Sequence, residues 1–275
     1  MTAQPNLRVE QNGDLLILRL NRPAVLNALT DELMQDLHRA LVTAKEDSGV
    51  RAIMLTGEGR GFCAGADLAA SALATPKVAD AAPALQGAGA EHVAEKLRLV
   101  FNPVIACMRS MPKPIITAVN GIAAGAGMSL AMAGDIIVCA ESASFLQAFT
   151  KIGLIPDAGS TWFLPRLVGD AKARALVMLA EKISAQEAER IGLVYKVIPD
   201  ADFEAESLKI GQFLASMPTR AYAYIKQAMN HSHDARLDEQ LELEASLQAQ
   251  AAVTDDCREG IAAFLEKRQA QFKGQ

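Results

Sequence analysis

The chain has 275 residues, about half of them apolar, which is enough to bury one large core. Its net charge of −5 argues against a nucleic-acid-binding surface or a polybasic membrane patch. The four cysteines are scattered without CxxC pairing and predict free thiols in a cytoplasmic protein rather than a disulfide framework. The polar N-terminus lacks the apolar stretch of a signal peptide.

The first predicted elements are a hairpin, a helix and a strand. The stretch LRVEQNGDLLILRL alternates around Asn12-Gly13, which predicts a hairpin with a type I′ turn. Thr30 is a candidate helix N-cap. The apolar positions of the following helix share one face: Leu33, Leu37, Ala40 and Leu41. Residues 51–56 predict a short buried strand, followed by the glycine-rich loop GEGRGFCAGADL.

The rest of the chain changes from mixed elements to helices alone. Residues 71–90 are rich in Ala, Pro and Gly without periodicity, which predicts a mobile surface segment. A helix is expected over about 91–109 and a strand over 115–119. Alternating strands and helices predict an α/β core over residues 1–200, and residues 201–275 predict a helical region.

Residues 115–140 form a long apolar run that resembles a membrane span in length. The run is interrupted by polar residues and glycines: Asn120, Gly121, Gly125, Gly127, Gly134 and Asp135. We therefore expect a buried strand, a glycine loop, a helix and a second strand, and no membrane association.

Two glycine-rich loops, GEGRGFCAG and GIAAGAGMSL, follow predicted strands. Phe62 and Leu130 stand where a dinucleotide-binding GxGxxG needs its last glycine, and neither a P-loop nor a GxSxG elbow occurs. Loops of this kind can point two backbone N–H groups at a substrate carbonyl and so form an oxyanion hole. On the glycines alone, a pair of tight turns is the favoured interpretation.

Outside these loops, one carboxylate and one histidine pair are candidates for chemistry. Asp157 stands alone in KIGLIPDAGSTW, either as a helix N-cap or as a catalytic acid/base. His231 and His233 are two residues apart, so on a helix they face different directions, and we expect no metal site there.

Five segments of the chain resemble the enoyl-CoA hydratase/isomerase, or crotonase, superfamily. They are NRPAVLNALT (21–30), GRGFCAGADL (59–68), PKPIITAVNGIAAGAGMSLAMAGDI (112–136), IGLIPDAGSTWFLPRLVG (152–169) and EGIAAFLEKRQAQFKG (259–274). The resemblance covers nearly the whole chain in the family order. It implies an α/β fold with a crotonase-like spiral of ββα units and a helical C-terminal trimerisation region. It also implies a coenzyme A thioester substrate, with no metal or redox cofactor.

Carried over by position, the resemblance implies an oxyanion hole at the backbone N–H groups of Ala66 and Ala126, with Asp157 as the catalytic residue. The implied substrate contacts are Ala24, Ala64, Asp67, Leu68, Asn102, Ser129, Phe149, Phe264 and Lys267. Phe264 and Lys267 would line the nucleotide end of a coenzyme A site, in a homotrimer or a dimer of trimers. The wall of the acyl pocket is expected from residues 71–100, and Cys63 is expected to be a small packed residue.

Hydratases of the superfamily activate water with two glutamates, and by alignment these positions hold Ser129 and Phe149. Hydration is therefore disfavoured, and Asp157 is the remaining acid. The segments FLQAFTKIGLIPDAGSTWFLPR and VFNPVI resemble the phenylacetate-degradation branch. Members of that branch open 1,2-epoxyphenylacetyl-CoA to the oxepin and shift Δ3 double bonds to Δ2.

Four alternatives stay open on the sequence. They are a simple Δ3,Δ2-enoyl-CoA isomerase, an enoyl-CoA hydratase of fatty-acid β-oxidation, a dehalogenase-like enzyme and a catalytically silent binding protein of the same fold. A dehalogenase would need a histidine where Asn102 stands, and His92 lies too far upstream by alignment. The acidic balance and the presence of Asp157 argue against the silent protein.

Overall fold

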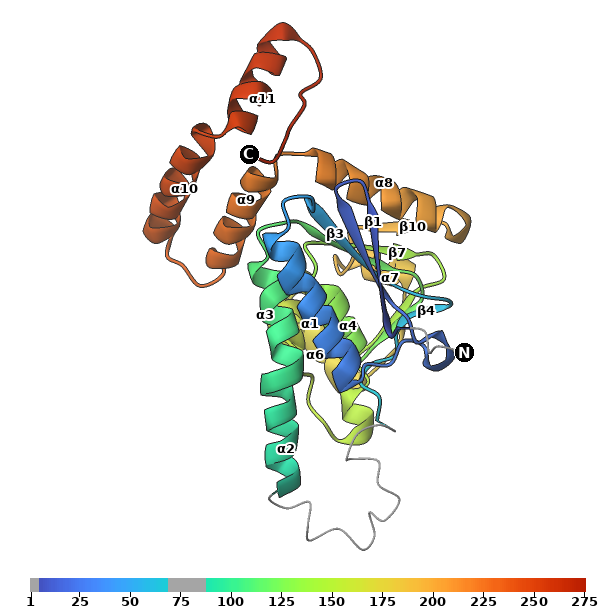
Figure 1. The fold of residues 1–275 in the computed structure, drawn as a ribbon. Coiled ribbons are helices and arrows are strands. Elements are labelled where there is room, and N and C mark those ends of the chain that lie inside the picture. The colour runs from blue at the N-terminus through green and yellow to red at the C-terminus, as the bar shows by residue number, and fades with distance from the viewer. Residues whose placement is uncertain (1–4, 69–87) are drawn as a thin grey trace, which may run out of the picture.

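Two β-sheets organise the computed structural model, which describes residues 5–68 and 88–275 (Figure 1). The six-stranded sheet has the order β1 (Leu7–Asn12), β2 (Leu15–Leu20), β3 (Ala52–Gly57), β5 (Ile115–Val119), β7 (Ile136–Ala140), β10 (Lys196–Ile198). The four-stranded sheet has the order β4 (Gly61–Cys63), β6 (Ile122–Ala124), β8 (Ser144–Leu146), β9 (Ile183–Ser184). Among the strands in the described residues, the β1–β2 and β8–β9 pairs are antiparallel and the other pairs are parallel.

Three consecutive strand pairs generate the predicted spiral of ββα units. In each of β3–β4, β5–β6 and β7–β8, the first strand joins the large sheet and the second joins the small one. A helix follows each pair. Because the repeated unit places every second strand in the same sheet, the loops after β4 and β6 lie beside one another at one end of the small sheet.

Helices cover the sheets and form the C-terminal part of the chain. They are α1 (Asp31–Glu46), α2 (Ala88–Lys96), α3 (Asn102–Ser110), α4 (Ala126–Met132), α5 (Ser160–Val168), α6 (Asp170–Leu179), α7 (Ala185–Arg190), α8 (Phe203–Ser216), α9 (Thr219–His231), α10 (Leu237–Ala252) and α11 (Asp255–Glu266). Short 3₁₀ turns are η1 (Pro23–Val25), η5 (Phe149–Ile152) and η6 (Asp200–Asp202).

The C-terminal helices do not all have the same surroundings. Helix α8 packs against β2, β3 and β7, and α9 is joined to α3 and to the residue before β7 by Lys226, which donates to Met108 C=O and Asp135; α10 and α11 extend away from the sheets (Figure 1). The division of the chain into a core over residues 1–200 and an oligomerisation region over 201–275 stays a prediction.

The structure confirms the helix that begins after Thr30 and the strands predicted at residues 51–56 and 115–119. Strands β3 and β5 are buried along their whole length, as expected for central parallel strands. Thr30 caps α1, since its hydroxyl accepts a hydrogen bond from Leu33 N–H at 3.2 Å. Residues 115–140 fold as β5, β6, α4 and β7, and no helix within the described ranges is long and apolar enough to cross a membrane.

The expected type I′ turn of the first hairpin is wrong. Asn12 pairs with Leu15, so the two central residues are Gly13 and Asp14. Only Gly13 has a positive φ, whereas a type I′ turn needs positive φ at both central positions. The position of the turn therefore follows from the pairing register of the apolar residues and not from the Asn-Gly dipeptide.

The helix expected over residues 91–109 contains a π-helical turn, η4 (Leu97–Phe101), between α2 and α3. Asn102 N–H donates to Leu97 C=O, five residues earlier. Pro103 explains the wider turn, because it has no N–H to give and its ring crowds the carbonyl one turn before it. Most of the segment expected to be mobile, residues 71–90, lies outside the described residues, and its last three residues begin α2.

Candidate active site

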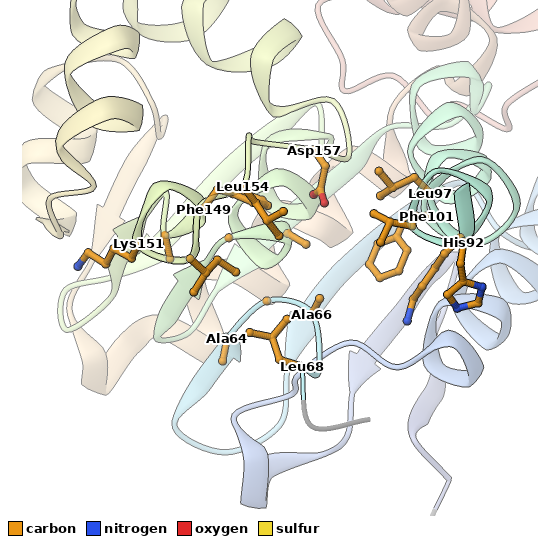
Figure 2. A pocket seen from close by; sticks show the side chains of 17 residues that line it. Ala64, Ala66, Leu68, His92, Leu97, Phe101, Phe149, Lys151, Leu154 and Asp157 are labelled. Carbon is orange, nitrogen blue, oxygen red and sulfur yellow. The ribbon is translucent and has the colours of Figure 1, made fainter. Parts of the chain in front are cut away.

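A cavity of about 260 Å³ lies where the two glycine-rich loops meet α2, η4 and the segment before α5 (Figure 2). Its lining is mostly apolar: Ala64, Gly65, Ala66, Leu68, His92, Val93, Lys96, Leu97, Phe101, Gly125, Ala126, Ala148, Phe149, Lys151, Ile152, Leu154 and Asp157. The carboxylate of Asp157 points into the cavity from one side, and Ala64 and Ala66 lie across from it (Figure 2). The structure therefore brings both predicted loops and the predicted acid together.

Ala66 presents a backbone amide to this cavity. Leu29 and Ala66 form a parallel β-bridge, in which Leu29 N–H donates to Gly65 C=O at 2.8 Å and Asp67 N–H donates to Leu29 C=O at 2.9 Å. Neighbouring amides of an extended segment point to opposite sides. The Ala66 N–H thus points away from Leu29, and no backbone acceptor bonds it within residues 5–68 and 88–275.

The second loop offers an equivalent amide. Ala126 is the first residue of α4, so its N–H has no carbonyl one turn earlier to bond. The preceding Gly125 is held by Leu146, whose C=O accepts from Gly125 N–H at 2.8 Å. Ala126 is buried, with 3% of its surface exposed, and lines the same cavity as Ala66.

Close glycine contacts bring the two loops together. A Cβ on Gly127 would lie 2.4 Å from Cys63 C=O and 2.7 Å from Cys63 Sγ, so only glycine fits there. A Cβ on Gly65 would lie 2.9 Å from Ala124 C=O and 3.7 Å from the Ala126 nitrogen. Cys63 itself is fully buried, as expected for a small packed residue.

Asp157 is held in a setting that favours its neutral form. Its Oδ1 is buried and has no hydrogen-bond partner within the part of the chain that the structure describes. Burial raises the pKa of this carboxyl from 3.8 to about 6, against a smaller lowering by its own backbone N–H. A carboxyl group with a pKa near 6 can both accept and return a proton close to neutral pH.

The alternative role of Asp157 as a helix cap is wrong. Helix α5 begins at Ser160, Gly159 occupies the N-cap, and no side chain caps this helix. Instead, Ser160 N–H donates to the backbone C=O of Asp157 at 3.0 Å. Ala158 and Gly159 both have positive φ, and a buried alanine in that conformation is strained. The sharp turn directs the Asp157 side chain into the cavity.

The two positions of the missing glutamates have different environments. Ser129 is fully buried in α4, its hydroxyl donates to Gly125 C=O at 3.3 Å, and it does not line the cavity. Phe149 lines the cavity and leaves 7% of its surface exposed. Neither side chain can act as a carboxylate base.

Several other predicted contacts lie away from this cavity. Ala24 and Asn102 are exposed, and Phe264 and Lys267 lie at the end of α11, where Phe264 is 83% exposed. Asp67 forms an ion pair with Arg22 at 2.9 Å instead of facing the cavity. Of the predicted set, the residues that line the cavity are Ala64, Ala66, Leu68, Ala126, Phe149 and Asp157.

The sequence missed the individual residues of one wall. His92, Val93, Lys96, Leu97 and Phe101 project from α2 and η4, within or just after the region expected to form the wall. Their helical spacing was the available signal. His92, which the alignment placed too far upstream to be the histidine of a dehalogenase, projects from α2 and lines this wall.

His231 and His233 do not share a site. His231 Nδ1 lies 3.1 Å from Gln240 Oε1, and the ring of His233 meets Trp162 edge to face at 5.1 Å between centroids. The described residues contain no group of three or more His, Cys, Asp or Glu side chains placed to hold a metal ion.

Comparison with known proteins gives a consistent result. A profile of the family described as Enoyl-CoA hydratase/isomerase matches residues 10–275. The chain is 43% identical to a Rhodobacter capsulatus protein named "Probable enoyl-CoA hydratase", covering 98% of each chain. It is 41% identical to the 1,2-epoxyphenylacetyl-CoA isomerase of Escherichia coli K12, covering 94% of this chain and 95% of that one.

A solved structure has the same fold over nearly the whole chain. The enoyl-CoA hydratase of Bacillus anthracis superposes with a TM-score of 0.86 at 32% identity, covering 98% of this chain and 100% of that one. The spiral of ββα units, the two converging glycine loops and these likenesses agree. This chain belongs to the enoyl-CoA hydratase/isomerase family.

Proposed function

We propose that this protein is a cytoplasmic acyl-CoA isomerase in which Asp157 carries the proton and the amides of Ala66 and Ala126 hold the thioester oxygen. The observation that carries the proposal is that, among the described residues, one carboxylate with an unpartnered buried oxygen faces these amides across an apolar cavity. The names of the relatives include both hydratases and an isomerase, so the family leaves the reaction type to the residues of this site.

The proposed reaction needs only these three groups. Asp157 removes a proton next to the thioester carbonyl, and the electron pair moves onto the thioester oxygen to form an enolate. The two amides stabilise the negative oxygen, a contribution of roughly 3 kcal/mol for one such donor. Asp157 then returns the proton at another carbon, so the double bond of a 3-enoyl-CoA moves and no atom is gained or lost. With an epoxide substrate, the bond between the two epoxide carbons also breaks as the six-membered ring expands to the oxepin, and the atoms again stay the same. This sequence requires neither a metal nor a redox cofactor.

Hydration would need a second carboxylate to orient water. Ser129 is buried away from the cavity, with its hydroxyl bonded to the backbone. Phe149 adds an apolar ring to the cavity at the second position. Both features support isomerisation over hydration.

Within the isomerases, we favour a substrate with a flat ring, of the 2-(1,2-epoxy-1,2-dihydrophenyl)acetyl-CoA type. Phe149 and Leu154 lie on one side of the cavity and Leu97 and Phe101 on the other (Figure 2). Aromatic side chains on facing walls suit a flat ring by stacking or edge contacts. The likeness to the 1,2-epoxyphenylacetyl-CoA isomerase supports this choice. A Δ3,Δ2-enoyl-CoA isomerase is the second candidate, favoured by the aliphatic side chains of the same lining.

We also propose a homotrimer or a dimer of trimers. Helices α9, α10 and α11 expose large apolar side chains that a monomer would leave in water: Ile225, Met229, Leu241, Ile261, Phe264 and Leu265. Phe264 and Lys267 lie outside the cavity of their own chain, which is consistent with a role near the nucleotide end of a neighbouring subunit's substrate.

The reaction type can be tested with three thioesters: crotonyl-CoA, a 3-enoyl-CoA and the epoxyphenylacetyl thioester. We expect isomerisation of at least one of the last two to exceed hydration of crotonyl-CoA by a factor of about 100 or more. Products are identified by mass and NMR, because hydration adds 18 mass units and isomerisation adds none. Hydration as fast as isomerisation would contradict the proposal, and binding without turnover of any thioester would favour a silent binding protein.

A further inference from the structure

Behind the Ala66 loop, on the side away from the cavity, an ion pair joins two distant parts of the chain. Arg22 Nη1 lies 2.9 Å from Asp67 Oδ2. The side chains are 21% and 13% exposed, so the pair is largely shielded from water. Asp67 directly follows Ala66, and neither charged residue lines the cavity.

The same guanidinium nitrogen also binds the segment that pairs with the Ala66 loop, residues 26–29. Arg22 Nη1 donates to Ala28 C=O at 2.5 Å, and Ala28 directly precedes Leu29. Since Leu29 pairs with Ala66 in the β-bridge, one cation is bonded to both sides of that bridge. Its two contacts fix how far the Ala66 segment can slide or rotate against residues 26–29.

A buried asparagine stabilises the turn that carries Arg22. Asn27 is fully buried, and its Oδ1 accepts from Arg22 N–H at 2.8 Å. Its amide nitrogen donates to Gly61 C=O at 2.7 Å, at the first residue of β4. Leu26 and Asn27 both have positive φ, a conformation that costs energy and persists where surrounding contacts impose it.

We propose that Arg22 is a positioning residue: through Asp67 and Ala28 it holds the Ala66 N–H in the direction that binds the thioester oxygen. The inference rests on the proposed oxyanion role of Ala66 and adds to it the group that sets the amide's orientation. A displacement of about 1 Å in such a site can cost about a hundredfold in rate.

The test uses Arg22→Met, which keeps an unbranched apolar stem but removes the guanidinium with its charge and its donors, and Arg22→Lys, which restores one charged donor. For Arg22→Met we expect kcat to fall about 10- to 100-fold while KM for the thioester changes less than about threefold. Arg22→Lys should recover a large part of the loss. The matched control is Arg174→Met, which breaks the exposed Arg174–Asp170 pair at 2.7 Å and should leave kcat unchanged.

A second measurement reports the oxyanion hole directly. The carbonyl stretch of a bound, ¹³C-labelled unreactive acyl-CoA moves to lower frequency when two amides bond its oxygen. We expect the wild type and Arg174→Met to show the full shift in the infrared difference spectrum, and Arg22→Met to show a smaller one. A merely structural role for Arg22 would lower the melting temperature and leave this shift in the folded protein intact.

The outcomes separate the two proposals. A full carbonyl shift and wild-type kcat in folded Arg22→Met would overturn the positioning role while leaving the oxyanion hole in place. No carbonyl shift in the wild type would overturn the oxyanion role of Ala66 and the positioning role with it. Should Arg22→Met fail to fold, Asp67→Asn removes the charge pair at constant size and is judged by the same two measurements.

Discussion

Replacing Asp157 with asparagine changes one carboxylate oxygen into an amide nitrogen and so tests catalysis and stability separately. Asparagine keeps the size of the side chain, but it cannot accept a proton. A positioned acid/base contributes about a hundredfold to ten-thousandfold, so we expect turnover of the preferred thioester to fall by that range. Binding of a saturated acyl-CoA, which needs no proton transfer, should change little.

The same substitution should make the folded protein more stable at neutral pH. The pKa of Asp157 is raised from 3.8 to about 6 by burial, a difference of about two units. At about 1.36 kcal/mol per unit, keeping this carboxylate ionised above pH 6 costs the folded state up to about 3 kcal/mol. An uncharged amide avoids that cost, so the melting temperature should rise by several degrees at pH 8.

The pH dependence has a defined sign. Between pH 3.8 and about 6 the folded state binds more protons than the unfolded state, so the wild type loses stability as the pH rises through this range. The Asp157→Asn variant lacks this loss, and the two proteins should converge in stability below pH 4. Turnover of the wild type should rise with pH to a plateau above about 6, because the base must be ionised to accept the proton.

The assays are steady-state turnover, calorimetric binding of a saturated acyl-CoA and thermal melting from pH 4 to 8. Asp234→Asn is the control, since Asp234 is exposed and forms a surface ion pair with Arg166. A variant that retains more than about a tenth of wild-type turnover would refute Asp157 as the proton carrier. A drop in melting temperature at pH 8 would refute the reasoning that burial destabilises its charge.

Three further predictions follow from packing and surface. Gly127→Ala should lower turnover at least tenfold and reduce the free energy of unfolding by about 1–3 kcal/mol, because its Cβ would lie 2.4 Å from Cys63 C=O. Gly49→Ala, in a surface turn, is the control. An unchanged turnover rate in Gly127→Ala would contradict the convergence of the loops. Lys226→Met should cost about 3 kcal/mol of unfolding free energy, since it leaves the Asp135 carboxylate, 2.7 Å away, without its buried cation; urea unfolding measures the cost, and Asp135→Asn in the same chain should restore part of it. Analytical ultracentrifugation at micromolar concentration should give the mass of three or six chains, and an active monomer would contradict the proposed assembly.

The sequence by itself determined the elements whose signals are local. Thr30 and the apolar spacing after it fixed α1, and the continuous apolar run of β5 marked a buried parallel strand. The glycine pattern of both loops, together with the resemblance, was enough to place Ala66 and Ala126 in one site. The helix and the strand depend on neighbours within a few residues, which sequence patterns record directly, whereas the pairing of the two loops came from the resemblance.

Tertiary structure alone decided the features that depend on distant contacts. The resemblance implied the ββα unit, but which strand of each pair joins which sheet came only from strand pairing, because short strands of unequal spacing leave no fixed period in the chain. The capping role of Asp157 was excluded by Ala158 and Gly159, whose left-handed turn moves the helix start to Ser160. The raised pKa of Asp157 likewise comes from burial by side chains far away in sequence, since desolvation is a property of the assembled cavity and not of the neighbouring residues.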